Sequence, residues 1–356
     1  MKILIATGGS GGHIFPALST AVQLRALGHQ VVFTGTPGLA TEKISRERFD
    51  FISLCAKGIS FSSPRRLFSS LGCMIRALFQ ALRILKSQHP DVVAGFGGYG
   101  AFPVVLAAAL SRYPTLIHEQ NVVPGKANYV LSKIVKKIAV SFSASKKHFN
   151  ARKTVLTGCP CRAQRKSVNN DELLEKFGLD KGKKTILVLG GSQGSHKINE
   201  EFLKAVPLLK KDLEFQVIHL SGKNDYLKLK EAYRGLDVRV CLFDFYDAVE
   251  EVYALADLVV SRCGAVTVTE IILFELPCIL IPYPFAGGHQ RENARVLSEA
   301  GAGKIIDEKD ITALRLTQEM ADILRDKAFK ERIPGRINGI IFPDAAVRLA
   351  NEIISL

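Results

Sequence analysis

One local pattern, a strand followed by a glycine-rich turn and a helix, occurs twice in this chain of 356 residues. The first copy has a strand at residues 1–7, the turn GGSGG at residues 8–12 and a helix expected at residues 15–27. In the second, the turn GGSQG at residues 190–194 precedes a helix expected at residues 198–209. This repetition half a chain apart predicts two Rossmann-like α/β domains, each a doubly wound parallel sheet.

Both turns offer bare backbone N–H groups, which bind phosphate well at the start of a helix. Neither turn fits the GxGxxG pattern of dinucleotide-binding proteins, and no Gly-Lys-Ser/Thr follows to make a P-loop. A third glycine run, GFGGYG at residues 95–100, comes after a strand at residues 91–94 and before a helix expected at residues 103–110. The turns therefore indicate phosphate binding without naming the ligand.

A second informative stretch, residues 256–293, contains a strand, a turn, a helix from Thr267, another strand and a helix at Gln290. In the first of these helices, Glu270 could accept two hydrogen bonds from the vicinal hydroxyls of a ribose. The amides of Ala265 and Val266 face an anion at the helix start.

Gln290 and Asn293 lie three residues apart, so they share a helix face. One acid and two amides at the ends of parallel strands indicate a nucleotide-sugar site. The alternative is a capped helix whose Glu270 is solvated.

Charge is divided unevenly along the chain. Residues 1–161 hold 11 lysines and 9 arginines against 5 acidic residues, a net charge of +15, whereas the remainder carries −1. A basic half implies an anionic partner, either nucleic acid or an anionic membrane surface. Since no nucleic-acid-binding motif is present, no nucleic-acid partner is expected.

The segment at residues 64–86 has apolar residues at helical spacing with basic residues between them. Its front part, residues 59–74, is expected to be loop-like, and Arg65, Arg66 and Phe68 make it a candidate membrane contact. The alternative is a helix packed on the sheet. No apolar run is long enough to span a membrane, and the first strand is too short for a signal peptide, so a cytoplasmic protein is expected.

The seven cysteines are expected to be reduced, and Cys159-Pro160-Cys161 is too tight for a usual zinc site, so no metal is expected. This run lies in Gly158–Arg162, the expected hinge between the domains. The first domain is expected to span residues 1–161 and the second residues 162–343.

Six motifs follow one another along nearly the whole chain: GGSGGHIFPAL at 8–18, GFGGY at 95–99, HEQN at 118–121, GGSQG at 190–194, SRCGAVTVTE at 261–270 and HQRENA at 289–294. Together they resemble the MurG family of glycosyltransferases. The resemblance implies the glycosyltransferase-B architecture, in which two Rossmann-like domains face each other across a cleft and the final helix, here residues 344–356, packs back on the first domain.

The resemblance also implies a reaction: inverting transfer of N-acetylglucosamine from UDP-N-acetylglucosamine to the membrane-embedded lipid I, undecaprenyl-pyrophosphoryl-N-acetylmuramyl-pentapeptide, giving lipid II for peptidoglycan. No metal and no cofactor are implied. The enzyme would be peripheral, on the cytoplasmic face of the inner membrane, in contact with its anionic surface.

Residue by residue, the resemblance implies contacts with the donor. The residues concerned are Ser10, Gly11, Gly12, Asn121, Arg162, Ser192, Tyr246, Ala265, Val266, Thr267, Val268, Thr269, Glu270, Gln290 and Asn293. Among them, Tyr246 would pack against the uracil, Glu270 would accept hydrogen bonds from the ribose hydroxyls, and Arg162 and Ser192 would contact phosphate.

The transfer needs a general base for the acceptor hydroxyl. His13, which closes the first glycine turn, is the best candidate because the ordinary histidine pKa lies near neutrality. His13 could instead orient a loop or bind acceptor phosphate. Glu119 is the alternative base. It could instead cap a helix or form an ion pair.

Two departures from the family pattern stand out. The hinge has the sequence Gly-Cys-Pro-Cys-Arg at residues 158–162 where the family has Gly-Asn-Pro-Val-Arg, so a thiol replaces an Asn that can bond to the backbone. The third glycine motif ends in Tyr-Gly-Ala-Phe-Pro at residues 99–103, which changes the expected acceptor floor. Three other functions stay open: a transferase of this architecture with another glycolipid or small-molecule acceptor, a UDP-sugar 2-epimerase, and a non-catalytic nucleic-acid-binding protein.

Overall fold

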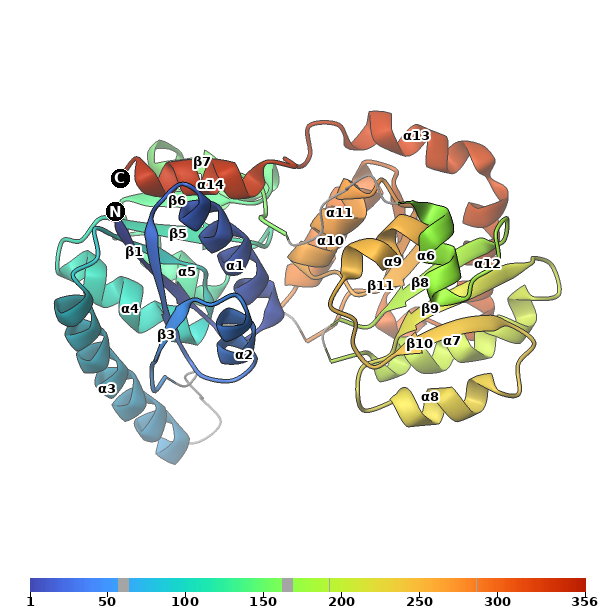
Figure 1. The fold of residues 1–356 in the computed structure, drawn as a ribbon, viewed down its shortest axis with the longest axis horizontal. Helices are drawn as coiled ribbons and strands as arrows, with labels where there is room; N and C mark the ends of the chain where they lie inside the picture. Colours follow the sequence, from blue (N-terminus) through green and yellow to red (C-terminus); the bar gives the residue numbers. More distant parts are fainter. Residues whose placement is uncertain (57–63, 162–168, 192, 286) are drawn as a thin grey trace. The chain divides into compact units, whose positions relative to one another are not determined.

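The chain folds into two compact units (Figure 1). Unit 1 comprises Met1–Arg162 and Phe342–Leu356, and unit 2 comprises Ala163–Ile341. The computed structural model describes residues 1–56, 64–161, 169–191, 193–285 and 287–356, without the side chains of residues 39–40, 64–69 and 327. The sequence-based boundary after residue 161 differs by one residue from the end of the first segment of unit 1. The sequence-based boundary after residue 343 differs by two residues from the end of unit 2.

The described strands of unit 1 form one seven-stranded parallel sheet in the order β3-β2-β1-β4-β5-β6-β7. They are β1 (Lys2–Thr7), β2 (Gln30–Gly35), β3 (Asp50–Ser53), β4 (Val92–Gly95), β5 (Thr115–Glu119), β6 (Lys137–Val140) and β7 (Thr154–Leu156). Successive residues such as Leu4 and Ile5, which point to opposite faces, are both buried. The sheet is therefore covered on both faces, as continuous apolar strands require.

The helices of unit 1 form the two covering layers. They are α1 (Gly11–Ala26), α2 (Leu39–Arg46), α3 (Pro64–Gln88), α4 (Gly98–Leu110), α5 (Lys126–Leu131), the 3₁₀ turns η1 (Ser143–His148) and η2 (Ala151–Lys153), and α14 (Ala345–Ile354). One core cluster joins the sheet to α1, α2 and α14, and another joins its other face to α3, α4 and α5. The C-terminal helix α14 lies beside α1 in Figure 1 and is part of the core of unit 1.

Unit 2 has a six-stranded parallel sheet among its described residues, in the order β10-β9-β8-β11-β12-β13. Its strands are β8 (Lys184–Leu189), β9 (Phe215–Leu220), β10 (Arg239–Phe243), β11 (Leu258–Ser261), β12 (Cys278–Leu280) and β13 (Gly303–Ile305).

Helices cover this second sheet as well. They are α6 (Asn170–Phe177), α7 (His196–Leu209), α8 (Tyr226–Tyr233), α9 (Val249–Leu255), α10 (Ala265–Leu273), α11 (His289–Glu299), η3 (Glu308–Asp310), α12 (Ala313–Arg325) and α13 (Lys327–Ile337). The main core cluster packs α7, α8 and α12 on one face of the sheet.

Several helices begin earlier than the sequence predicts. α1 begins at Gly11 and α4 at Gly98, so the glycines expected to form turns occupy the first helical turn. Pro16 and Pro103 consequently lie inside helices. α3 is helical from Pro64, so the expectation of a loop continuing to residue 74 is wrong. Pro334, a residue that usually ends a helix, lies inside α13, which continues to Ile337.

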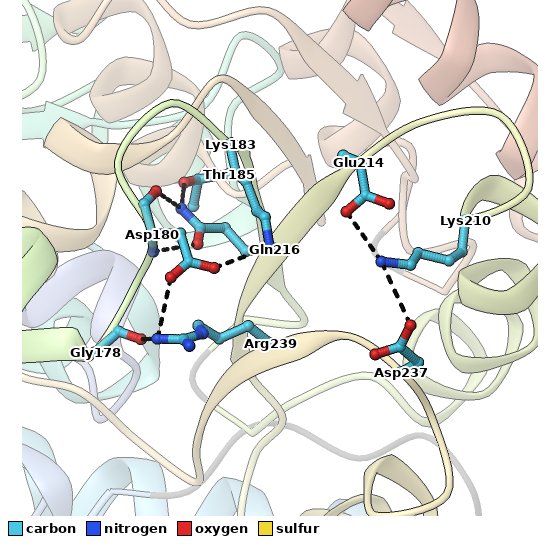
Figure 2. Close-up of polar contacts among 9 residues, drawn as sticks. All are labelled: Gly178, Asp180, Lys183, Thr185, Lys210, Glu214, Gln216, Asp237 and Arg239. Atoms are coloured by element: carbon cyan, nitrogen blue, oxygen red, sulfur yellow. Dashed lines mark hydrogen bonds and ion pairs between the residues drawn. The ribbon is translucent and has the colours of Figure 1, made fainter.

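A polar cluster ties the amino ends of three strands in unit 2 together (Figure 2). The buried Gln216 of β9 accepts a hydrogen bond from the Asp180 backbone N–H (2.7 Å) and donates to the Asp180 carbonyl and the Thr185 hydroxyl (3.1 Å each). Arg239 of β10 donates to the Gly178 carbonyl (2.6 Å). This cluster fixes the turn before β8 at the end of the sheet opposite to the glycine turns.

Candidate active site

Each sheet changes its direction of growth once, and the glycine turns lie at these places. In unit 1, β2 and β3 are added on one side of β1, and the next strand, β4, pairs with β1 on its other side. In unit 2 the same change occurs between β8 and β11. Ligands of open α/β sheets bind beyond the carboxyl ends of the strands at such points. Each unit therefore has its own candidate site.

In unit 1, the turn after β1 and the turn after β4 touch each other. A Cβ atom on Gly98, whose φ is +79°, would lie 2.9 Å from the Cα of Gly8. A Cβ atom on Gly97, whose φ is +86°, would lie 3.1 Å from the Cε1 of His13. Both glycines are therefore required by left-handed backbone and by close approach. His13 lies against this double turn.

The three residues expected to approach the donor, Ser10, Gly11 and Gly12, form the start of α1. The Ser10 carbonyl accepts hydrogen bonds from the backbone N–H groups of His13 (3.0 Å) and Ile14 (3.1 Å). The N–H groups of Gly11 and Gly12 have no acceptor within the helix, because they belong to its first turn. Gly12 is exposed and has open space around its Cα, so these donors suit an anion.

His13 is half-buried, and its Nδ1 lies 3.2 Å from the Oε1 of Gln120. Burial lowers the pKa of His13 below its usual value, and the Glu119 carboxylate and the bond to Gln120 offset part of that effect. The imidazole is consequently neutral at neutral pH. A neutral imidazole is the form that a general base requires.

Glu119, at the end of β5, is 1% exposed and accepts four hydrogen bonds. One oxygen takes the backbone N–H and side-chain amide of Asn121 (3.0 and 3.1 Å). The other takes the Gly125 N–H (3.1 Å) and the Asn128 amide (2.9 Å). The carboxylate thus holds the loop between β5 and α5. This geometry favours a positioning role for Glu119 over the role of a base.

In unit 2, α10 begins at Ala265 directly after the turn that follows β11. The N–H groups of Ala265, Val266 and Thr267 are the free donors of its first turn, whereas the Val268 N–H is already bonded to the Gly264 carbonyl (2.9 Å). The side chains of Val268 and Thr269, also expected at the donor, are buried.

Glu270 is 8% exposed, and its Oε2 accepts a hydrogen bond from the Tyr253 hydroxyl (3.1 Å). The Tyr253 ring stacks on Phe274, with ring centroids 5.4 Å apart. Tyr253 therefore restrains the direction of the Glu270 carboxylate. Sequence reasoning gave no role to Tyr253, because it lies 17 residues from its partner in a different helix.

Gln290 and Asn293 lie on one face of α11, as their spacing predicts, and both contact the turn at Cys263. The Gln290 Oε1 accepts from the backbone N–H groups of Cys263 (3.1 Å) and Tyr283 (2.9 Å). The buried Asn293 amide donates to the Cys263 carbonyl (3.1 Å). These two side chains hold the turn before α10, and the Gln290 Nε2 remains as a donor for a ligand.

Tyr246, expected at the uracil, is half-buried in an aromatic group. Its ring centroid lies 4.8 Å from that of Phe243 and 5.6 Å from that of Phe177. Its hydroxyl donates to Glu251, which also pairs with Lys176 (2.6 Å). The ring is thereby fixed in place, and its remaining exposed surface is what a base could stack on.

Arg262 is a further residue that sequence reasoning missed. It is 9% exposed, donates to the Ile281 carbonyl (3.2 Å) and the Ser195 hydroxyl (2.7 Å), and pairs with Glu308. Because it ties the ends of β11 and β12 to the start of α7, it fixes the floor of the unit 2 site. Its position directly after a buried strand was the available signal.

In unit 1, Thr36, Gln120 and Asn128 were also missed. Thr36 follows β2, is 6% exposed, and its hydroxyl has no hydrogen-bond partner among the described residues. It lies near the glycine turn, 3.5 Å from the position of a Cβ on Gly9. A buried hydroxyl without a partner at this end of the sheet suits a ligand atom.

Five of the expected contacts cannot be placed. Arg162 and Ser192 lie outside the described residues, and so do the side chains of Arg65, Arg66 and Phe68 in the first turns of α3. In the parts of the chain that the structure describes, no helix is long and apolar enough to cross a membrane, and no group of three or more His, Cys, Asp or Glu residues could hold a metal ion.

Two family models match the chain. The glycosyltransferase family 28 N-terminal domain matches residues 3–140, and the glycosyltransferase family 28 C-terminal domain matches residues 185–348. Each match contains the glycine turn that follows the first strand of its unit and the switch point of one sheet.

Curated relatives match over nearly the full length. A protein of Halothermothrix orenii is 40% identical over 92% of this chain and 91% of its own length. One of Thermoanaerobacter sp. strain X514 is 38% identical over all of both chains. Both are named UDP-N-acetylglucosamine–N-acetylmuramyl-(pentapeptide) pyrophosphoryl-undecaprenol N-acetylglucosamine transferase.

Solved structures agree with the fold. The crystal structure of Acinetobacter baumannii MurG is similar, with a TM-score of 0.79 and 28% identity, covering 100% of this chain and 99% of the other. A UDP-GlcNAc 2-epimerase from Neisseria meningitidis has a TM-score of 0.72 at 13% identity, covering 100% of both chains. The latter likeness shows a shared fold alone.

Proposed function

Because this chain belongs to glycosyltransferase family 28, we propose that it transfers N-acetylglucosamine from UDP-N-acetylglucosamine to N-acetylmuramyl-(pentapeptide) pyrophosphoryl-undecaprenol, with inversion at the anomeric carbon. The observation that carries the proposal is the 40% identity to a relative of that name across 92% of the chain. The likeness includes both units and both candidate sites. It therefore supports the same donor and the same acceptor.

Unit 2 binds the donor in this proposal. Glu270, held by Tyr253, accepts the ribose hydroxyls, since a buried carboxylate forms strong hydrogen bonds with neutral donors. The free N–H groups at the start of α10 receive the diphosphate, and the positive end of the helix dipole favours its charge. The Nε2 of Gln290 donates to the sugar.

The leaving UDP carries the negative charge that develops in the reaction. Fixed N–H donors at a helix start stabilise such charge because they need no reorganisation as it forms. Gln290 and Asn293 hold the turn at Cys263, so these donors are already oriented before the ligand arrives. Arg162 and Ser192 remain proposed phosphate contacts.

Unit 1 supplies the base. His13 removes the proton from the acceptor hydroxyl as that oxygen attacks the anomeric carbon, and the bond between that carbon and the UDP oxygen breaks. Two observations support this role: His13 lies at the switch point of the sheet, and its lowered pKa keeps it unprotonated at neutral pH.

The acceptor's lipid requires a surface on unit 1 that meets a membrane. The outer face of α3 carries a row of exposed apolar side chains, Leu71, Ile75, Phe79 and Leu82, which are 43–63% exposed. The spacing of four, four and three residues keeps them on one helix face. We call these four residues the α3 row. Together with the basic charge of residues 1–161, the row supports peripheral binding to an anionic membrane.

One experiment tests the reaction. Donor radiolabelled in the sugar is incubated with a lipid I analogue, and the product is isolated and its anomeric configuration read by NMR. A β-linked disaccharide product and released UDP are expected. Label that stays on the nucleotide as an epimerised sugar would point to the epimerase instead, and transfer only to other glycolipids would refute the acceptor.

A further inference from the structure

A chain of hydrogen bonds runs through unit 1 from the backbone at Gly158 to His13. Its links are the Gly158 carbonyl to His118 Nε2 (3.0 Å), His118 Nδ1 to Gln120 Nε2 (3.2 Å), and Gln120 Oε1 to His13 Nδ1 (3.2 Å). His118 and Gln120 are no more than 1% exposed. Each hydrogen bond joins one donor to one acceptor, so the position of the proton in one bond determines the position of the proton in the next bond.

The first link fixes the tautomer of His118. A carbonyl oxygen can only accept, so the His118 Nε2 must carry the proton that faces Gly158. The Ser141 hydroxyl is a second acceptor for this proton (3.3 Å), because its own proton goes to the Glu119 carbonyl (3.1 Å). Burial lowers the pKa of His118 to about 4, so the ring is neutral and its Nδ1 is an acceptor.

The second link fixes the amide of Gln120. Its Nε2 lies 3.0 Å from the Phe96 carbonyl and 3.2 Å from the His118 Nδ1. Both of these groups are acceptors, so the NH₂ end must face them. The Gln120 Oε1 is therefore the atom that faces His13, and the reversed amide would place an oxygen against two acceptors.

We infer that Gln120, itself oriented by His118 and Phe96, fixes His13 as the Nδ1–H tautomer and so makes Nε2 the basic nitrogen. This inference extends the proposed role of His13 as the base. Gln120 acts through His13 and is a positioning residue. Without Gln120, the bond to the Phe96 backbone is the remaining restraint on the imidazole, so a larger share of molecules would carry the proton on Nε2. In those molecules Nε2 could not take the proton from the attacking hydroxyl.

The tautomer can be measured in the full-length protein without any substrate. Histidine is labelled with ¹⁵N, and long-range ¹H–¹⁵N correlation spectra are recorded at about pH 8, where His13 is neutral. Comparison with His13→Gln identifies the His13 signals. A pyrrole-type shift at Nδ1 and a pyridine-type shift at Nε2 are expected. The opposite assignment would overturn the inference, whatever the enzyme's activity.

Variants then test whether Gln120 holds the proton. In Gln120→Leu, a mixture of His13 tautomers is expected, with turnover about tenfold to a hundredfold lower and UDP affinity unchanged. Retention of the Nδ1–H form alone would contradict the inference. The matched control is Ser141→Ala, which removes one of two acceptors of the His118 proton and should leave the His13 tautomer unchanged.

A second variant covers the case in which Gln120→Leu does not fold. Gln120→Glu keeps an acceptor for the His13 Nδ1–H, and the proton of its acid group replaces an amide N–H in front of the Phe96 carbonyl and the His118 Nδ1. The Nδ1–H tautomer of His13 should therefore persist in this variant. A folded Gln120→Glu protein with the proton of His13 on Nε2 would show that residue 120 does not control this imidazole. Loss of transfer in His13→Gln tests the proposal that His13 is the base. The role of His13 and the role of Gln120 can therefore be refuted independently of each other.

Discussion

At the scale of single residues, Glu270 is the group that we propose binds the ribose of the nucleotide. Its buried carboxylate is directed by the Tyr253 hydroxyl and sits in the helix whose first turn offers free N–H donors. We predict that Glu270→Ala weakens UDP binding by about 1–3 kcal/mol, because charge-assisted hydrogen bonds to the ribose are lost. Calorimetry measures this difference.

The matched variant is Tyr253→Phe, which keeps the ring and its stacking on Phe274 but removes the hydroxyl. Its effect should be smaller than that of Glu270→Ala and should vanish in the double variant, since the hydroxyl acts through the carboxylate. Unchanged UDP affinity in folded Glu270→Ala would remove Glu270 from the donor site.

His13 acts after binding in this scheme. We predict that His13→Ala lowers turnover by about 10²- to 10⁴-fold, because an acid–base group contributes on that order, while UDP affinity stays near that of the native chain. Steady-state kinetics with calorimetry gives both values. A loss of turnover below about tenfold would exclude His13 as the base. Glu119 would then be the next candidate, despite its four hydrogen bonds to the loop before α5 and to Asn128.

At the scale of elements, α3 carries the row of exposed apolar side chains that we propose for membrane contact. We predict that Ile75→Ser with Phe79→Ser reduces sedimentation with anionic vesicles, because two exposed apolar side chains of the α3 row can no longer insert. Added salt should weaken the binding of the native chain, since its basic charge contributes. Activity on a short-chain, water-soluble acceptor should be retained.

A control for this test lies in unit 2. Leu227 and Leu314 are 76% and 61% exposed, on α8 and α12. Leu227→Ser with Leu314→Ser removes as much exposed apolar surface but should leave vesicle binding unchanged. Equal losses in both double variants would mean that apolar exposure in general, and not the α3 row, drives the association.

The C-terminal helix α14 is an integral part of unit 1. Leu349 is fully buried in the core that joins α1 to the sheet, and Lys137 of β6 pairs with Glu352 (2.7 Å). We predict that Leu349→Ala lowers the free energy of unfolding by about 2–5 kcal/mol, since it leaves a cavity in this core. Val347→Ala on the same helix, at a residue 38% exposed, should cost less than about 1 kcal/mol. Denaturant titrations compare the two, and similar losses would contradict a core role for α14.

At the scale of the whole molecule, the sequence predicts the two α/β units well because their strands are continuous buried apolar runs followed by glycines. The helix starts were harder to predict. At α1 and α4 the first helical residues are glycines, and no side chain caps either start, so no local signal marks Gly11 or Gly98. In addition, α13 continues through Pro334, which local propensity does not predict, and Ile333 and Ile337 of this helix are buried.

The candidate site also has residues that the sequence identifies and residues that it does not. Residues that belong to a motif, such as His13 and Glu270, can be found by inspection. Gln120 and Arg262 also lie in motifs, but their orienting roles cannot be inferred from the sequence because their partners are distant: Gln120 lies 107 residues from His13, and Arg262 lies 67 residues from Ser195. Only the fold brings these pairs together. The motifs therefore indicate the groups that we propose to react and bind more readily than the groups that orient them.

Each unit also contains one fully buried histidine that couples its stability to pH. Burial lowers the pKa of His118 in unit 1 to about 4 and that of His219 in unit 2 to about 3. The unfolded chain, with an ordinary histidine pKa near 6.5, binds these protons first. The stabilisation is therefore complete above about pH 6.5 and is lost as the pH falls toward the folded-state pKa values.

We predict that the free energy of unfolding falls by about 2 kcal/mol for each of the two histidines between pH 6.5 and 5, which follows from about 1.4 kcal/mol per pH unit for each proton taken up. Denaturant titrations followed by circular dichroism at several pH values measure the slope. His219→Gln lowers stability at neutral pH, because the bonds to Tyr233 (2.9 Å) and Asn199 (3.0 Å) are altered, but it should remove one histidine's share of the slope. His89→Asn, at an exposed position, should leave the slope unchanged. A slope that is the same in the native chain and in His219→Gln would mean that His219 takes up no proton on unfolding.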